Sequence, residues 1–65
     1  MEIEAQVIES LPNGLYKVLY QGVEYICYMA GKLRKNKISI LVGDRVRVLL
    51  DPYKGKATNR ITWRL

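Results

Sequence analysis

Residues 15–29 read LYKVLYQGVEYICYM, and they give the clearest indication of the fold class. Two runs with many β-branched and aromatic residues, Leu15–Tyr20 and Val23–Met29, are separated only by Gln21 and Gly22. Runs of this composition are typical of strands, and a two-residue connection that ends in glycine is typical of a tight hairpin turn. The stretch therefore predicts a β-hairpin. Both faces of this hairpin carry apolar side chains, so one face needs a covering loop or a ligand.

The segments on either side of the hairpin extend the strand pattern. Residues 2–9 alternate polar and apolar positions, as a half-buried strand does, with Ile3, Ala5 and Val7 facing inward. Residues 45–50 and 59–65 alternate in the same way. The inward positions that we expect in these last two strands are Val46, Val48, Leu50, Ile61, Trp63 and Leu65.

The connections between the strands limit the possible folds. Residues 11–14, Leu-Pro-Asn-Gly, predict a tight turn, and residues 51–58 form a polar segment with Pro and Gly that is typical of a loop. Residues 30–37 lose the period of two and contain good helix formers, so we expect a short helix there. Five strands with one helix between the third and fourth predict an all-β, five-stranded antiparallel Greek-key barrel of the OB type. An SH3-like barrel is the main alternative, and the helical connection favours the OB type.

Length and composition exclude several classes of function. A chain of 65 residues has room for one domain, residues 1–65. The chain has no His and only one Cys, Cys27, so we expect no zinc site, no internal disulfide and no cofactor. Without His, and with no Ser in a nucleophile motif, we predict that it is not an enzyme. No apolar run approaches the roughly 20 residues that span a bilayer, and no secretory signal is apparent, so we expect a cytoplasmic monomer without a membrane partner.

The charges are divided unevenly along the chain, whose formal net charge is +5. Residues 1–30 carry four glutamates against one lysine, which gives a net charge of −3. Residues 31–65 carry ten basic residues against two aspartates, which gives a net charge of +8. This division predicts one basic region, which suits a polyanionic partner. The alternative is that folding mixes the two halves.

Two groups of cations are candidates for binding phosphates. The first group has no acid within it, so its mutual repulsion is best offset by a phosphate backbone; the alternative is a solvated helix face. The second group falls on the outward phase of the last two predicted strands, where arginine can bridge phosphates or stack on a base; the alternative is pairing with Glu2 and Glu4. The candidates are Lys32, Arg34, Lys35 and Lys37 in the first group and Arg45, Arg47, Arg60 and Arg64 in the second.

Two tyrosines are candidates for stacking on bases. Tyr28 lies next to the basic segment, and Tyr53 follows Pro52 in the predicted loop. The remaining tyrosines are expected to be half-buried, and Trp63 is expected in the core.

Several motifs, taken together and in order, resemble bacterial translation initiation factor 1. The resemblance covers nearly the whole chain and rests on residues 7–13 (VIESLPN), 31–36 (GKLRKN) followed by Ile38, 41–46 (LVGDRV), 52–53 (PY) and 60–64 (RITWR). It implies a single S1-like OB domain that binds the decoding (aminoacyl-tRNA) site of the small ribosomal subunit. The implied partners are 16S-type rRNA, ribosomal protein S12 and initiation factors 2 and 3. RNA contacts are implied at the matching positions Lys32, Arg34, Lys35, Arg45, Tyr53, Arg60 and Arg64.

Two other functions remain open from the residues alone. One is a cold-shock-like chaperone that binds single-stranded RNA, which uses the same kind of barrel and the same basic surface. The other is a small-barrel protein-interaction module whose basic face meets an acidic protein.

Overall fold

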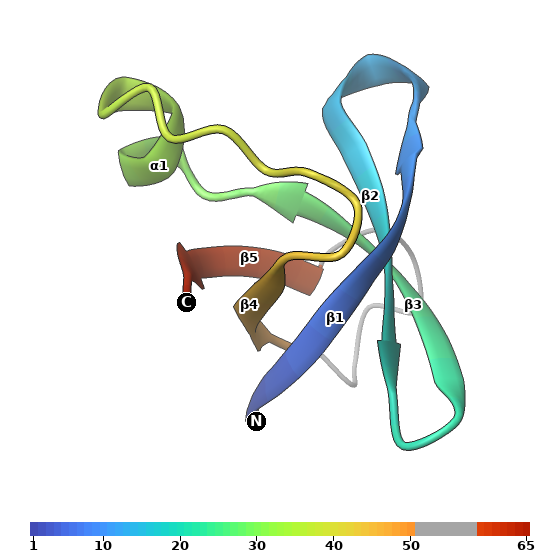
Figure 1. Cartoon of the computed structure of the whole chain (residues 1–65). Coiled ribbons are helices and arrows are strands. Elements are labelled where there is room, and N and C mark those ends of the chain that lie inside the picture. Colours follow the sequence, from blue (N-terminus) through green and yellow to red (C-terminus); the bar gives the residue numbers. More distant parts are fainter. Residues whose placement is uncertain (51–58) are drawn as a thin grey trace.

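The protein is a five-stranded barrel with one short helix. The computed structural model describes residues 1–50 and 59–65. The elements in chain order are β1 (Glu2–Leu11), a 3-10 turn (Pro12–Gly14), β2 (Leu15–Tyr20), β3 (Val23–Met29), α1 (Gly31–Lys35), β4 (Arg45–Leu49) and β5 (Asn59–Arg64). The strands close into a barrel in the order β1-β2-β3-β5-β4 (Figure 1). The expected all-β barrel, with its helix between the third and fourth strands, is confirmed.

The hairpin of β2 and β3 has the predicted strands and turn. Tyr20 lies opposite Val23, and the two residues between them, Gln21 and Gly22, have φ values of 50° and 78°. Positive φ at both central positions defines a type I′ turn, whose twist matches that of the flanking strands. The turn chemistry visible in the sequence therefore sets the register of the hairpin.

The expectation of a wholly antiparallel barrel is wrong at one strand pair. β3 and β5 pair in parallel, with residues 27–29 opposite residues 59–61, whereas the other four pairs are antiparallel. A parallel pair needs a long crossover connection, and here α1 and β4 lie within that connection. The crossover brings β5 back beside β3 and closes the barrel.

The interior of the barrel is filled by side chains from one face of each strand, together with Leu33 of α1 and Ile40. The predicted inward positions of β1 and β4 are buried, and Leu50 packs partly buried against them. Burial raises the pKa of the Cys27 thiol to about 12, because desolvation disfavours the thiolate. The core residues are Ile3, Ala5, Val7, Val18, Cys27, Leu33, Ile40, Val46, Val48 and Ile61.

The expected inward face of β5 is wrong beyond Ile61. Residues 47–48 of β4 lie opposite Trp63 and Ile61, so Thr62 is an extra residue without a partner on β4. Such a β-bulge reverses the face on which the following residues lie. Trp63 and Leu65 are therefore on the outside, with exposed fractions of 45% and 51%.

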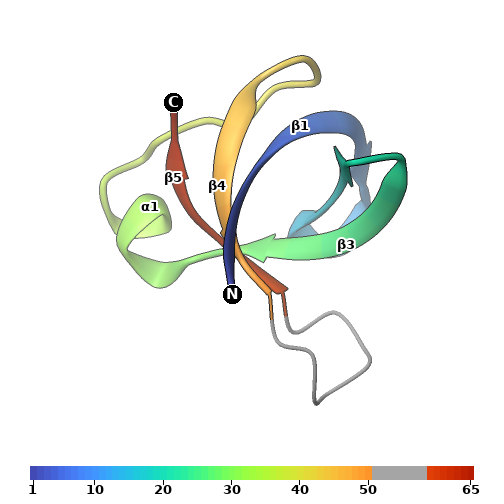
Figure 2. The ribbon, with the colours of Figure 1, turned by 90° about the horizontal axis from the view of Figure 1, so that it is seen from below.

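The helix α1 is held against the barrel by one side chain and by a backbone bond beside its N-terminal end, and a local backbone bond closes its C-terminal end. Leu33 is its buried residue. The Ala30 N–H donates to the Ile61 carbonyl at 2.9 Å, and the Ile38 N–H donates to the Leu33 carbonyl at 3.0 Å. Figure 2 shows α1 outside the barrel on the side of β5. Across residues 1–50 and 59–65, no helix is long and apolar enough to cross a membrane.

Candidate nucleic-acid interface

The closure of the barrel places an aromatic and a cationic candidate side by side. Tyr28 on β3 lies opposite Arg60 on β5, and Arg60 lies opposite Leu49 on β4. All three belong to the outward phase of their strands, and Tyr28 has an exposed fraction of 36%. The parallel pairing of β3 and β5 therefore brings together two predicted site residues that are 32 positions apart in the sequence.

A second outward row lies nearer to α1. Arg47 on β4 is opposite Trp63 on β5, and the Lys32 ammonium of α1 lies 5.9 Å from the centroid of the Trp63 ring. This distance is that of a cation–π contact. Simple alternation assigns Trp63 to the core, and no local signal in the sequence reveals the bulge that moves it outside.

The first cation group surrounds the one apolar anchor of the helix. Because Leu33 points into the barrel, its neighbours on this short helix lie toward solvent. Lys32, Arg34 and Lys35 of α1, and Lys37 just beyond it, are all exposed, as their predicted role requires.

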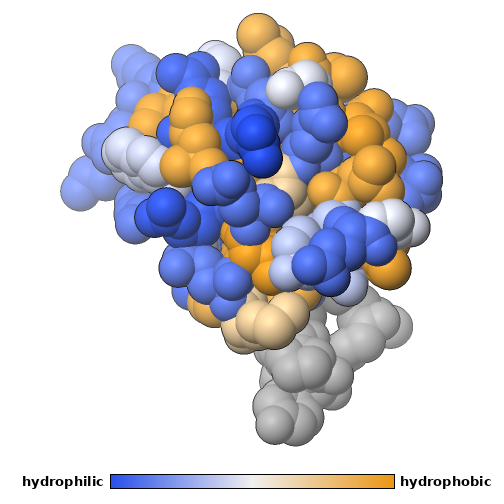
Figure 3. Space-filling model, turned by 60° about the horizontal axis from the view of Figure 1, so that its bottom comes forward, coloured by the Kyte–Doolittle hydropathy of each residue, from blue (hydrophilic) through white to orange (hydrophobic). Residues whose placement is uncertain are grey.

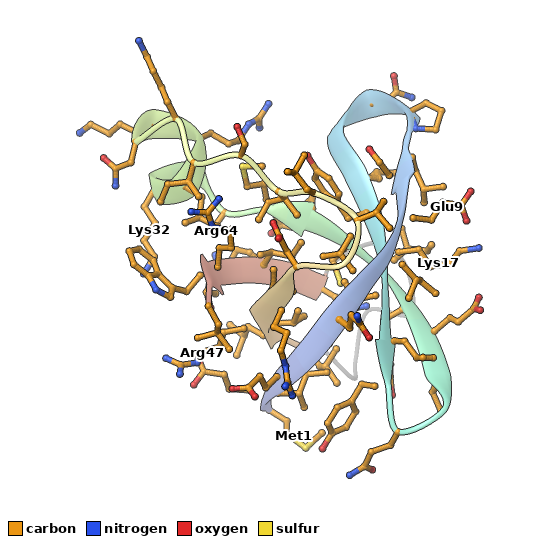
Figure 4. All side chains as sticks on the ribbon, in the orientation of Figure 1. Met1, Glu9, Lys17, Lys32, Arg47 and Arg64 are labelled. Atoms are coloured by element: carbon orange, nitrogen blue, oxygen red, sulfur yellow. The ribbon has the colours of Figure 1, made fainter. Side chains whose placement is uncertain are left out.

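The labelled charges lie on two different sides of the barrel. In Figure 4, Lys32, Arg47 and Arg64 lie on the side of α1, β4 and β5, whereas Glu9 and Lys17 lie on the opposite side. Figure 3, seen from further below, shows hydrophilic residues gathered on the left, toward α1, and a larger hydrophobic area on the right. Folding therefore keeps Lys32, Arg47 and Arg64 apart from Glu9, although β1 places Glu4 beside Arg47 on β4.

Glutamates of residues 1–30 form ion pairs with two cations, Lys17 and Arg45. Glu9 and Glu24 lie 3.3 Å and 3.6 Å from the Lys17 ammonium, and the Glu9 hydrogen bond is the main cause of a raised Lys17 pKa. Arg45 lies 3.4 Å from Glu4, so this arginine has one of the two glutamate partners that the alternative of internal pairing named. Within residues 1–50 and 59–65, the other basic candidates have no carboxylate partner within ion-pair distance.

The prediction that Arg64 lies on the outward phase of β5 is wrong, although the residue is exposed. Because of the bulge at Thr62, Arg64 lies opposite the buried Val46 and on the same phase of the sheet. Its guanidinium is still exposed and donates to the Ser39 carbonyl at 3.0 Å. Arg64 therefore joins the end of β5 to the segment that follows α1, which uses part of its capacity to donate to phosphates.

The tyrosines divide as expected. Tyr16, Tyr20 and Tyr25 pack partly buried against the core, which leaves Tyr28 as the exposed tyrosine of the described residues. Tyr53, the second predicted stacking residue, lies outside the described residues.

A closed OB barrel that carries exposed aromatic rings beside unpaired cations defines a class: a small RNA-binding OB domain. The family model described as translation initiation factor 1A / IF-1 matches residues 1–65. The chain belongs to this family, and its function lies in translation initiation.

Two solved structures show the same fold. The solution structure of translation initiation factor 1 from the Wolbachia endosymbiont strain TRS of Brugia malayi is 39% identical, with a TM-score of 0.81 over 100% of this chain and 77% of that one. The crystal structure of YjeQ from Thermotoga maritima is 25% identical, with a TM-score of 0.76 over 100% of this chain and 23% of that one. Similarity to the first supports both the fold and the assignment to translation initiation.

Proposed function

We propose that this chain binds the decoding (aminoacyl-tRNA) site of the small ribosomal subunit and assists initiation together with initiation factors 2 and 3. It contacts 16S-type rRNA there, with ribosomal protein S12 as a neighbour. It acts in the cytoplasm as a single-domain monomer, and by occupying a site, not by catalysing a reaction. Family membership and the basic face support the proposal.

The observation that carries the proposal is the set of exposed cations without internal carboxylate partners. Glu9 and Glu24 pair with Lys17, and Glu4 pairs with Arg45, so these three carboxylates leave the other cations available. Phosphates that neutralise such cations release condensed counterions, which drives binding. Apart from Arg64, whose guanidinium donates to the Ser39 carbonyl, six described residues qualify: Lys32, Arg34, Lys35, Lys37, Arg47 and Arg60.

The first test is the affinity for isolated small subunits as a function of salt concentration. If all six cations contact phosphates, the logarithm of the association constant falls against the logarithm of salt with a slope of about −4 for single-stranded rRNA and about −5 for duplex rRNA. A flat dependence would contradict the electrostatic mechanism. The double variant Arg34→Glu, Arg60→Glu should bind weakly and remain folded, and wild-type affinity in this variant would remove the proposed face.

Two matched single variants show whether binding depends on where a positive charge lies or only on the net charge of the protein. Arg34→Gln and Lys17→Gln each remove one positive charge, but Lys17 lies on the opposite side of the barrel and already pairs with two glutamates. We expect Arg34→Gln alone to weaken binding to small subunits. Equal effects of the two changes would show that only net charge matters.

Co-sedimentation tests the choice of target. The protein should sediment with small subunits and not with large ones. Equal affinity for unstructured RNA would instead indicate a general single-strand chaperone, and binding that survives RNase treatment would indicate a protein partner.

A further inference from the structure

The feature that carries a further inference is the exposed indole of Trp63. Ile61, two residues earlier, is fully buried, whereas Trp63 has an exposed fraction of 45%. Large aromatic side chains are normally buried in small domains, which have little other means of stabilisation. Exposure of the largest apolar side chain of this chain therefore calls for a partner.

The outward position of Trp63 is held by the backbone. The extra residue, Thr62, donates from its hydroxyl to the Arg47 carbonyl at 3.3 Å, which bonds the bulge to β4. Beyond the bulge, the Arg64 guanidinium donates to the Ser39 carbonyl at 3.0 Å, and the Leu65 N–H donates to the Arg45 carbonyl at 2.8 Å. These bonds tie β5 down on both sides of Trp63, so the indole is presented on a rigid segment.

The surroundings of the indole are cationic. Lys32 lies at 5.9 Å from the ring centroid, and Arg47 lies opposite Trp63 on β4. Glu4 lies opposite Arg47 on the other side of β4, but its carboxylate pairs with Arg45. A half-exposed indole, with one cation over its ring and another on the neighbouring strand, fits a ligand that offers a flat π system joined to negative charge.

We propose that Trp63 is the platform on which one unpaired RNA base stacks, while Lys32 and Arg47 bind the phosphates on either side of that base. The inference rests on the proposed function and adds to it a requirement for a base that is free of its own stack. Stacking on aromatic side chains is the usual way in which proteins bind single-stranded or displaced nucleotides. A base in a regular duplex keeps its faces covered by its neighbours and cannot use this platform.

The test uses the fact that Trp63 is the only tryptophan of the chain, so the intrinsic fluorescence reports on this site alone. The full chain is titrated with a short single-stranded oligoribonucleotide, with the same sequence in a duplex, and with isolated small subunits. We expect the emission to be quenched by the single strand and by the small subunits but not by the duplex. Unchanged emission on saturation with small subunits would overturn the proposal.

Variants complete the test, with binding measured by the anisotropy of labelled RNA. Trp63→Leu should weaken binding to the single strand about tenfold or more, the usual effect of removing a stacking aromatic, whereas Trp63→Phe should retain most of the affinity. The salt slope of Trp63→Leu should match the wild type, because no phosphate contact is lost. Leu65→Ala, a change at an exposed apolar neighbour on the same strand, is the matched control and should bind normally.

Two outcomes separate this inference from the proposed function. If Trp63→Leu binds small subunits like the wild type while Arg34→Glu, Arg60→Glu does not, the platform is wrong and the proposed function stands. If an acidic peptide quenches Trp63 as strongly as the oligoribonucleotide does, at equal charge, the platform is not a base-stacking site.

Discussion

Replacing Leu33 by Ala should show how much of the RNA-binding face depends on one buried side chain. The helix α1 has five residues, far fewer than the 12 to 15 that an isolated helix needs, and Leu33 is its buried contact with the barrel. The Leu33 side chain is fully buried, so the change removes three carbons from the core. At about 0.8 kcal/mol for each carbon, the transfer loss alone is roughly 2.4 kcal/mol. The cavity left behind raises the expected cost to about 3 kcal/mol.

This cost is large for a chain of this size, whose whole free energy of unfolding should be about 3 to 10 kcal/mol. With an m value of about 1 kcal/mol/M, the midpoint of urea unfolding should fall by about 3 M. Circular dichroism and Trp63 fluorescence follow the transition. Arg34→Ala is the control on the same helix, and it should change stability by less than about 0.5 kcal/mol.

The second part of this prediction concerns the affinity of Leu33→Ala for small ribosomal subunits. Leu33→Ala keeps every charge, yet it should weaken binding to small subunits at a temperature at which the barrel is still folded, because Lys32 and Arg34 lose their fixed positions. An unchanged urea midpoint would show that Leu33 does not anchor α1. A lowered midpoint with wild-type affinity would refute the claim that the position of the helix matters.

Three further changes test the turn, the core thiol and the acidic side. Gly22→Ala places a side chain at φ 78° and should lower the free energy of unfolding by about 1 kcal/mol, which corresponds to a fall in Tm of about 4 to 8 °C. Gly31→Ala is the control, because Gly31 lies in open space without positive φ, and it should not destabilise the protein. Equal melting temperatures of the two variants would contradict the strain at Gly22. The Cys27 thiol has a pKa of about 12 when folded against about 9.0 as its ordinary value, so its contribution to stability is complete below about pH 9 and is lost as pH rises toward 12. The free energy of unfolding of the wild type should therefore fall between about pH 9 and pH 12 by an amount that is absent in Cys27→Ala. Identical dependence on pH in the two proteins would contradict this effect. Glu9→Gln should lower the Lys17 pKa toward its ordinary value in an NMR titration, because Glu9 is the main cause of the rise, and an unchanged titration would refute that cause.

The inward face of β1 and β4 could be predicted because it follows from local chemistry. Ile3, Ala5 and Val7 alternate with polar residues, and in a strand this period of two assigns sides without reference to any other strand. The type I′ turn at Gln21 and Gly22 is equally local, since only two residues must take positive φ. Part of the charge division of the chain also survived folding, because α1 and β5 come from the same basic half and lie side by side, whereas the pairing of β1 with β4 places Glu4 beside Arg47.

The alternation of polar and apolar residues gave the wrong faces where pairing with a neighbouring strand introduces a β-bulge. The bulge at Thr62 exists only in the pairing of β5 with β4, and it moves Trp63 outside and Arg64 to the opposite phase. A similar shift at Ile8 in β1, between Val7 and Glu9, escapes the local pattern for the same reason.

The five strands, the hairpin turn, the short basic helix and the uneven distribution of charge along the chain can all be read from local sequence, since these features depend on periods and on neighbours along the chain. The fold as a whole sets the parallel pairing of β5 with β3, the position of Tyr28 opposite Arg60, the ion pair of Glu4 with Arg45 and the exposure of Trp63. These features depend on which strand lies beside which and at what register. That choice minimises the free energy of the whole barrel, so no short stretch of the chain contains it.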